Sequence, residues 1–379
     1  MLPAEVSLQD LPLRPELKGE KPYGAPQLDV PCRLNVNENP YPPSPEVAEA
    51  MAEAVRQAAR TINRYPDREV RQLRSKLARY LGYGLLFDQV WAANGSNEVM
   101  VQVLQAFGGP GRRLLTFSPT YSMYPEYARN THTEWLTVPR RPDYTIDLPA
   151  AWEAIEHLKP DVIVVATPNN PTGTSTPIGV VERLCRATGG VVVVDEAYQE
   201  FSRAQDNTCV RLLHHYGNLI VARTMSKAFA FAGGRVGYVA TSRAIVDALR
   251  IVRLPYHLSA MTQAIAGVAL DHAAEMLAQV SRLREIRDDG LLVLRQMGCQ
   301  VIDSDANFCL FGRFRDRHAV WEALLRRGVL VRELGPAGHL RVSTGTSQEM
   351  QRFYAALAEI VAEPGVLVTA EPGPGERRG

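Results

Sequence analysis

The sequence predicts an α/β protein in which a mostly parallel sheet is sandwiched by helices and a second, smaller α/β domain follows. Through the middle of the chain, helical stretches alternate with short apolar runs at 114–117, 162–166, 191–194, 219–222 and 236–240. Runs of β-branched residues this continuous are typical of strands buried on both faces, as in a parallel sheet covered by helices. The chain has 379 residues, 46% of them hydrophobic, which is enough for two separate cores.

Helix patterns lie on both sides of this sheet pattern. Ser44 is a suitable N-cap, Pro45 suits the first helical position, and apolar residues recur at helical spacing from there. A second helix is expected over 70–81, ending at Gly82. After about residue 275 the pattern changes to a long helical stretch. The elements expected there are helices at 276–297, 319–326 and after Ser347, and strands at 299–302, 307–311, 329–332 and 340–343.

Composition and periodicity divide the chain into four predicted segments. Residues 1–45 are rich in proline and lack periodicity, which predicts an extended N-terminal arm. Residues 46–275 would form a large cofactor-binding domain, and residues 276–365 a small C-terminal domain. Residues 366–379 are rich in proline and glycine, so we expect a disordered tail.

Charge and cysteine content limit the classes of partner. Lys and Arg number 42 against 41 Asp and Glu, so no overall field would attract nucleic acid or a membrane surface. The five cysteines are scattered and lack metal-ligand spacing, which argues against a disulfide framework and against a metal site. No apolar run approaches the ~20 residues that span a bilayer, and the first residues show no secretion signal. We therefore expect a cytoplasmic protein.

Polar side chains stand directly after three of the predicted strands. Asn169 follows one strand in TPNNPTG, and Asp195 ends the next in VVVVDEAY. Ser226 and Lys227 follow a third strand in LIVARTMSK. Because the carboxyl ends of the strands line one crevice in a doubly wound sheet, we expect these side chains to converge on one ligand.

A lysine, a buried carboxylate and a phosphate cradle together suit pyridoxal phosphate. A lysine amine bonds to the aldehyde of this cofactor, and an acidic residue keeps the ring nitrogen protonated, which makes the ring an electron sink. Asp195 suits that ionic hydrogen bond, because its charge would be costly in an apolar environment without a cationic partner. The segment GSN at 95–97 precedes a helical pattern, and backbone N–H groups at a helix start bind anions. Ser226 and Arg235 can add a hydroxyl and a guanidinium.

Each of these features also has an ordinary structural alternative. A lone lysine after a strand is usually a solvated surface residue, and an aspartate there could be the N-cap of the next helix. PNNPTG is by default a turn, and GSN could be an ordinary helix start. Arginines of the small domain could be surface residues or salt-bridge partners. The occurrence of all the features together favours the functional interpretation.

A set of motifs extends over nearly the whole chain. They are LKGEKPYGAPQ, LNVNENPYPPSP, NRYPD, ANGSNE, SPTYSMY, PNNPTG, VVDEAYQEF, TMSKAFAFAGGRVGY, LPYHLS and LRVSTGT. Together they resemble the fold-type I aminotransferases, and the finer pattern is similar to the histidinol-phosphate aminotransferase family. The resemblance implies a fold-type I aminotransferase fold, pyridoxal phosphate as the cofactor and a homodimer.

The resemblance also implies roles for individual residues. Lys227 would carry the cofactor and move protons, and Asp195 would pair with the ring nitrogen. Asn169 and Tyr198 would hydrogen-bond to the ring 3-oxygen, and Tyr121 would stack on the ring. The phosphate would be held by Ser96, Asn97, Thr224, Ser226, Arg235 and, from the neighbouring subunit, Tyr65.

The substrate site implied by the resemblance contains Tyr23, Tyr256, Arg332 and Arg341, together with Asn169. An arginine fork can bind either the phosphate of histidinol phosphate or the carboxylates of glutamate. Position 97 is more often aspartate in this family, so only the side-chain role of Asn97 departs from the pattern.

The implied reaction is transamination of histidinol phosphate with 2-oxoglutarate, which gives imidazole acetol phosphate and glutamate in histidine biosynthesis. Lys227 would act as general base and acid, and ping-pong kinetics would follow. The main alternative is an aromatic amino acid aminotransferase that acts on phenylalanine, with Arg341 at the α-carboxylate. A decarboxylase of a phosphorylated amino acid and a non-catalytic aminotransferase-like sensor domain are further alternatives.

Overall fold

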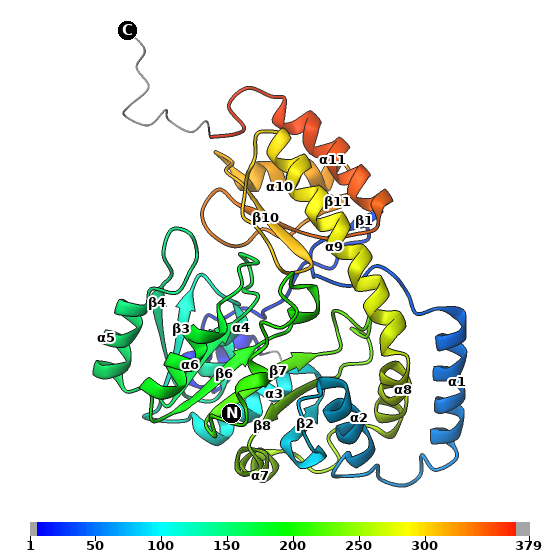
Figure 1. The fold of residues 1–379 in the computed structure, drawn as a ribbon. Coiled ribbons are helices and arrows are strands. Elements are labelled where there is room, and N and C mark those ends of the chain that lie inside the picture. The colour runs from blue at the N-terminus through cyan, green and yellow to red at the C-terminus, as the bar shows by residue number, and fades with distance from the viewer. Residues whose placement is uncertain (1–5, 369–379) are drawn as a thin grey trace.

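The computed structural model describes residues 6–368 and contains a central sheet of seven strands (Figure 1). The predicted α/β class and the mostly parallel sheet are confirmed. The strand order is β2-β8-β7-β6-β5-β3-β4, and only β8 runs against its neighbours. The strands are β2 (Val90–Ala93), β3 (Arg113–Ser118), β4 (Glu134–Pro139), β5 (Val162–Ala166), β6 (Val191–Asp195), β7 (Leu219–Thr224) and β8 (Gly237–Thr241).

Helices cover both faces of this sheet. Along β6, Val192 and Val194 pack into one core while Val191 and Val193 pack into the other, so successive residues of the strand are all buried. The first face is covered by α2 (Arg71–Leu81), α5 (Leu148–Leu158), α6 (Ile178–Ala187) and α8 (Ala260–Asp271), with α1 (Pro45–Ala59) against α8. The second face is covered by α3 (Gly95–Phe107), α4 (Met123–Asn130) and α7 (Arg243–Val252).

A smaller α/β unit follows the large sheet. The long helix α9 (Ala273–Gln296) runs from α8 into this unit, and Figure 1 shows it beside β10 and α11. The other elements are β9 (Gln300–Val301), β10 (Phe308–Gly312), α10 (Arg317–Arg326), β11 (Val329–Leu330), β12 (Leu340–Ser343) and α11 (Ser347–Val361). Strands β9, β10 and β12 form an antiparallel sheet, which places β12 beside β10.

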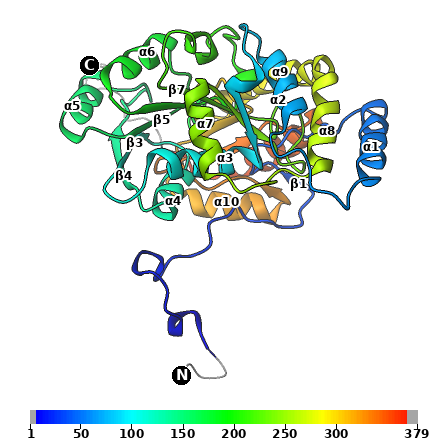
Figure 2. The same ribbon diagram turned by 90° about the horizontal axis from the view of Figure 1, so that it is seen from below.

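The N-terminal segment follows an irregular path and then joins the smaller unit. Figure 2 shows its first part extending away from the body of the molecule. It contains only short 3₁₀ turns before β1 (Cys32–Arg33), which pairs in parallel with β11. Cys32 and Leu34 are buried in the core of the smaller unit. This pairing was not expected, because a strand of two residues leaves no periodic pattern in the sequence.

The predicted helix ends agree with the structure. The Ser44 hydroxyl accepts a hydrogen bond from the N–H of Val47, Pro45 is the first residue of α1, and Gly82 follows α2. Two strands of the large sheet, β2 and β4, were not predicted. β4 is an edge strand with several exposed residues, and β2 contains two alanines, so neither has a continuous β-branched run.

The part of the chain that the structure describes contains no helix that is long and apolar enough to cross a membrane. All five cysteines are free and buried. The segment predicted to be a disordered tail, 366–379, lies outside the described residues except for 366–368, where Leu367 pairs with Phe314.

Candidate active site

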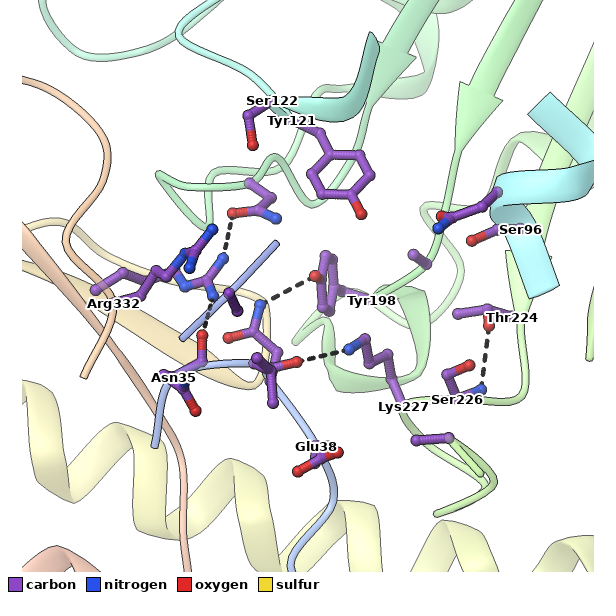
Figure 3. A pocket seen from close by; sticks show the side chains of 18 of the residues that line it. Asn35, Glu38, Ser96, Tyr121, Ser122, Tyr198, Thr224, Ser226, Lys227 and Arg332 are labelled. Atoms are coloured by element: carbon purple, nitrogen blue, oxygen red, sulfur yellow. Dashed lines mark hydrogen bonds between the residues drawn. The ribbon is translucent and has the colours of Figure 1, made fainter. Parts of the chain in front are cut away.

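A cavity of about 570 Å³ lies at the carboxyl ends of β5, β6 and β7. The N-terminal segment, the start of α3 and residues of the smaller unit complete its wall. Figure 3 shows Ser96 and Ser226 at one side, Arg332 at the opposite side and Lys227 between them. The predicted site residues that line it are Tyr23, Ser96, Asn97, Tyr121, Asp195, Tyr198, Thr224, Ser226, Lys227, Arg235, Arg332 and Arg341.

Asp195 is the last residue of β6 and is held by two hydrogen bonds. Its Oδ2 accepts from the Tyr124 hydroxyl at 2.9 Å, and its Oδ1 accepts from the N–H of Ala197 at 3.3 Å. Burial raises the pKa of the carboxyl to about 6, and these two hydrogen bonds partly oppose the shift. The site thus contains a buried carboxylate whose charge is stabilised when a cation lies against it.

Lys227 lies in the segment after β7, and its Nζ donates to the carbonyl oxygen of Val36 at 2.8 Å. Burial, with a smaller contribution from the charge of Arg341, lowers the pKa of the amine to about 8, and the charge of Glu38 opposes the shift. A larger fraction of this amine is therefore neutral near pH 8 than of an exposed lysine.

One end of the cavity is built to receive an anion. A Cβ atom added to Gly95 would lie 2.6 Å from Nη2 of Arg235, and one added to Gly237 would lie 2.1 Å from the backbone nitrogen of Ser96. The two glycines therefore allow the guanidinium and the start of α3 to approach each other closely. Nη1 of Arg235 donates to the Ser226 hydroxyl at 3.4 Å. Two hydroxyls, a guanidinium and a helix start fit a phosphate group.

The side chain of Asn97 is hydrogen-bonded within the fold. Its Oδ1 accepts a hydrogen bond from the Tyr127 hydroxyl at 2.8 Å. Asn97 is the third residue of α3 and lines the cavity, while its side-chain oxygen is occupied by this bond to Tyr127.

The opposite end of the cavity is also cationic. Arg341, on β12, is 4% exposed and donates to Oδ1 of Asn170 at 2.7 Å and to the carbonyl oxygen of Asn35 at 2.8 Å. Burial lowers the pKa of its guanidinium to about 10, so burial disfavours its charge until an anion lies nearby. Arg332 pairs with Arg341 through the backbone, and its side chain reaches the carbonyl oxygen of Gly24 at 3.4 Å.

Asn169, predicted as a site residue, does not line the cavity. This residue is fully buried, and its amide donates to the carbonyl oxygen of Pro119 and to the Thr172 hydroxyl, so it stabilises the loop. The next residue, Asn170, lines the cavity and accepts the hydrogen bond from Arg341. The two asparagines are adjacent in a loop, and the sequence alone gave no means of choosing between them.

Tyr65 and Tyr256 do not line this cavity. Tyr65 is 79% exposed, Tyr256 is 39% exposed, and their rings stack with centroids 4.3 Å apart. The resemblance assigns Tyr65 to the site of the neighbouring subunit, which a single chain does not test. Tyr256, assigned to the substrate, lies outside the cavity of its own chain.

Three residues of the site escaped sequence analysis: Tyr124, Asn37 and Ser122. Tyr124 donates to Asp195, and Asn37 donates to the Tyr198 hydroxyl at 3.0 Å. The Ser122 hydroxyl bonds to the hydroxyl of Tyr23, a predicted residue, at 2.6 Å. Asn37 lies in the quoted motif LNVNENP, and Tyr124 in SPTYSMY. Polar residues inside these motifs were the available signal, but nothing in the sequence showed which of them faced inward.

Comparison with known proteins is consistent with this geometry. The chain matches the family model for aminotransferase class I and II over residues 31–357. A histidinol-phosphate aminotransferase from Thermobifida fusca is 56% identical, over 93% of this chain and 96% of the relative. A second, histidinol-phosphate aminotransferase 3 from Burkholderia lata, is 57% identical over 94% of this chain and 98% of the relative.

Solved structures show the same fold. The histidinol-phosphate aminotransferase of Sinorhizobium meliloti, solved in complex with pyridoxal-5′-phosphate, superposes with a TM-score of 0.79 at 25% identity. The match covers 88% of this chain and 91% of that protein.

Proposed function

This chain belongs to the class I and II aminotransferases, and from that membership we propose that it transfers an amino group from histidinol phosphate to 2-oxoglutarate. The products would be imidazole acetol phosphate and glutamate, in histidine biosynthesis. The observation that carries the proposal is the single cavity that joins Lys227 and Asp195 to a cationic group at each end. Relatives at 50–57% identity named for this reaction support the choice of substrate.

The residues of the cavity fit pyridoxal phosphate. The end formed by Ser96, Ser226 and Arg235, with Thr224 and the backbone of Asn97, would hold the phosphate. When bound, the cofactor supplies a cationic ring that withdraws electrons from the carbon atom bearing the amino group. The relative solved in complex with pyridoxal-5′-phosphate supports the choice of this cofactor.

Asp195 would hold the ring nitrogen in its protonated form. Its carboxylate is buried and already has two donors, so a cation in the cavity removes the cost that raises its pKa. Tyr198 and Asn170 would bind the ring 3-oxygen, and Tyr121 would cover one face of the ring. Asn170 would then take the role that the resemblance implied for Asn169.

Lys227 would carry the cofactor and, once released from it by the incoming amine, move a proton from the substrate carbon. A pKa near 8 suits this work, because the amine can accept a proton and return it near neutral pH. The carbonyl oxygen of Val36 accepts a hydrogen bond from Nζ and would fix the direction of the amine before it reacts.

Arg341 and Arg332 would bind the anionic end of each substrate. Nε of Arg341 is buried and lacks a hydrogen-bond partner among the described residues, which leaves a donor for an incoming phosphate or carboxylate. Tyr23 lines the same end of the cavity. Two cationic side chains at this end suit a phosphate-bearing substrate and also the carboxylates of 2-oxoglutarate.

We further propose a homodimer in which Tyr65 and Tyr256 complete the site of the partner. Their exposed stack has no role in the cavity of their own chain. Ile251 and Leu254, close to Tyr256 in sequence, are 83% and 74% exposed, which suits burial against a second copy.

The experiment that tests the reaction compares two amine donors. Purified protein loaded with pyridoxal phosphate is given 2-oxoglutarate and either histidinol phosphate or phenylalanine, and the formation of glutamate is followed. We expect kcat/KM for histidinol phosphate to be at least about 100-fold higher than for phenylalanine, because only histidinol phosphate offers a phosphate to the arginines. Lys227→Ala should abolish both reactions, and borohydride should no longer trap the cofactor on the protein. Equal or better use of phenylalanine would refute the substrate, and trapping at another lysine would refute the role of Lys227.

A further inference from the structure

The hydroxyl of Tyr198 has a single hydrogen-bond partner among the residues that the structure describes. Nδ2 of Asn37 donates to it at 3.0 Å. Tyr198 is 7% exposed and Asn37 is 2% exposed, so water has little access to the bond. Figure 3 shows the Tyr198 ring facing into the cavity near Lys227.

Asn37 is itself held at every polar atom. Its backbone N–H donates to the Ser343 hydroxyl at 2.8 Å, and that hydroxyl donates to Oδ1 of Asn37 at 3.0 Å. Its carbonyl oxygen accepts from Nδ2 of Asn307 at 3.0 Å. Asn37 adopts φ of +56°, a left-handed conformation that asparagine tolerates better than most residues.

These hydrogen bonds determine whether Asn37 or Tyr198 is the donor in the bond between them. The Ser343 hydroxyl has one proton, and it uses this proton on Oδ1 of Asn37, so the amide nitrogen faces Tyr198. An amide nitrogen can only donate, so the Tyr198 oxygen accepts at that contact. The single proton of Tyr198 is then left for an acceptor in the cavity.

We propose that Asn37, locked by Ser343, is a positioning residue that makes the Tyr198 hydroxyl a hydrogen-bond donor toward the ring 3-oxygen of pyridoxal phosphate. The inference rests on the proposed function, since it requires this cofactor in the cavity. A donor stabilises negative charge on the ring oxygen, which makes the nitrogen joined to Lys227 release its proton at lower pH.

Asn37→Asp is the sharpest test. A carboxylate has nearly the shape of the amide and also tolerates the left-handed backbone, but it can only accept. The Tyr198 proton should turn toward it and away from the cavity. In the loaded protein we expect the pH of the absorbance transition of the cofactor to rise by about half to one unit, the size of one hydrogen bond. Cofactor-free protein should bind pyridoxal phosphate about 2- to 10-fold more weakly.

The negative charge added by Asn37→Asp would by itself also raise the pH of this transition, so a double-mutant cycle is needed. The other groups that act on Tyr198 are Arg341 on β12, Asp195 at the end of β6 and Tyr23 in the N-terminal segment, and the substitution leaves them in place. If Asn37 acts through the hydroxyl, Asn37→Asp should lose most of its effect in a Tyr198→Phe background. Tyr198→Phe alone should also raise the pH of the absorbance transition.

A matched control adds the same charge two residues away. Asn39 donates to the carbonyl oxygen of Ala228 and not to Tyr198, so Asn39→Asp should shift the transition less than half as far. An equal shift with Asn39→Asp, or a shift by Asn37→Asp that persists in Tyr198→Phe, would show a simple charge effect and overturn the proposal. If borohydride does not trap the cofactor on Lys227 of the wild-type protein, the proposed function itself is refuted.

Discussion

At the scale of single residues, Asp195 combines a functional charge with a cost to stability. Burial raises its pKa from 3.8 to about 6, so the folded chain retains a proton that the unfolded chain releases. The raised pKa leaves the free energy of unfolding unchanged below about pH 4 and lowers it as the pH rises from about 4 to 6. Above about pH 6 the reduction is complete. The cost in the cofactor-free protein is on the order of 3 kcal/mol.

Asp195→Asn should therefore stabilise the cofactor-free protein. The amide oxygen still accepts from the N–H of Ala197, and the buried charge is lost. Toward Tyr124 the direction reverses, because the amide nitrogen donates and the hydroxyl, which donates to Asp195, has to accept. We expect denaturant unfolding at pH 8 to give a free energy up to about 3 kcal/mol higher than wild type, with the difference shrinking toward pH 4.5. The same variant should bind pyridoxal phosphate more weakly, because the ring nitrogen loses its counter-ion. Equal stability of the two proteins at pH 8 would contradict the account.

At the scale of elements, the anion end depends on how closely α3 approaches β8. A Cβ atom on Gly237 would lie 2.1 Å from the backbone nitrogen of Ser96, where no side chain can rotate away. The first turn of α3 would have to move, and its N–H groups would move with it.

Gly237→Ala should therefore reduce stability and cofactor affinity together. Forced overpacking of this kind costs about 1–3 kcal/mol, and a displaced phosphate cradle should weaken pyridoxal phosphate binding about 10-fold or more. Denaturant unfolding and titration of the cofactor-free protein measure the two effects. Gly179→Ala is the matched control, because it lies in α6 with open space around it, and it should be neutral or stabilising by roughly 0.5–1 kcal/mol. Normal cofactor affinity in Gly237→Ala would exclude the close approach as a requirement.

At the scale of the whole molecule, the location of Tyr65 decides whether one chain suffices. Its hydroxyl would reach a phosphate only in a second subunit, as its exposure and its absence from the cavity suggest. Removal of this donor should weaken cofactor binding about 10- to 100-fold, as for a hydrogen bond to a charged group.

Hybrid dimers test this arrangement. A dimer of Tyr65→Ala with Lys227→Ala, isolated through two different tags, should contain one intact site and show about half of wild-type activity at limiting cofactor. A dimer of wild type with a chain carrying both substitutions should be nearly inactive, since its remaining Lys227 faces the altered Tyr65. The opposite pattern would place Tyr65 in the site of its own chain.

Much of the fold could be predicted, because β5, β6 and β7 are buried on both faces and so consist of unbroken apolar runs. Asp195, Thr224 and the segment with Lys227 follow those runs directly, which made their convergence predictable. The edge strand β4 and the two-residue β1 left no such pattern. The choice between Asn169 and Asn170 depended on the path of one loop.

By itself, the sequence determined the α/β class, the strand-end positions of Lys227 and Asp195 and the membership of an aminotransferase family, since these depend on local patterns and motifs. Only the tertiary structure decided that Asn37, Tyr198 and Ser343 form one hydrogen-bonded chain. These residues are far apart in sequence and come from three different segments. Packing brings them together, and the direction of a hydrogen bond depends on every partner that packing supplies.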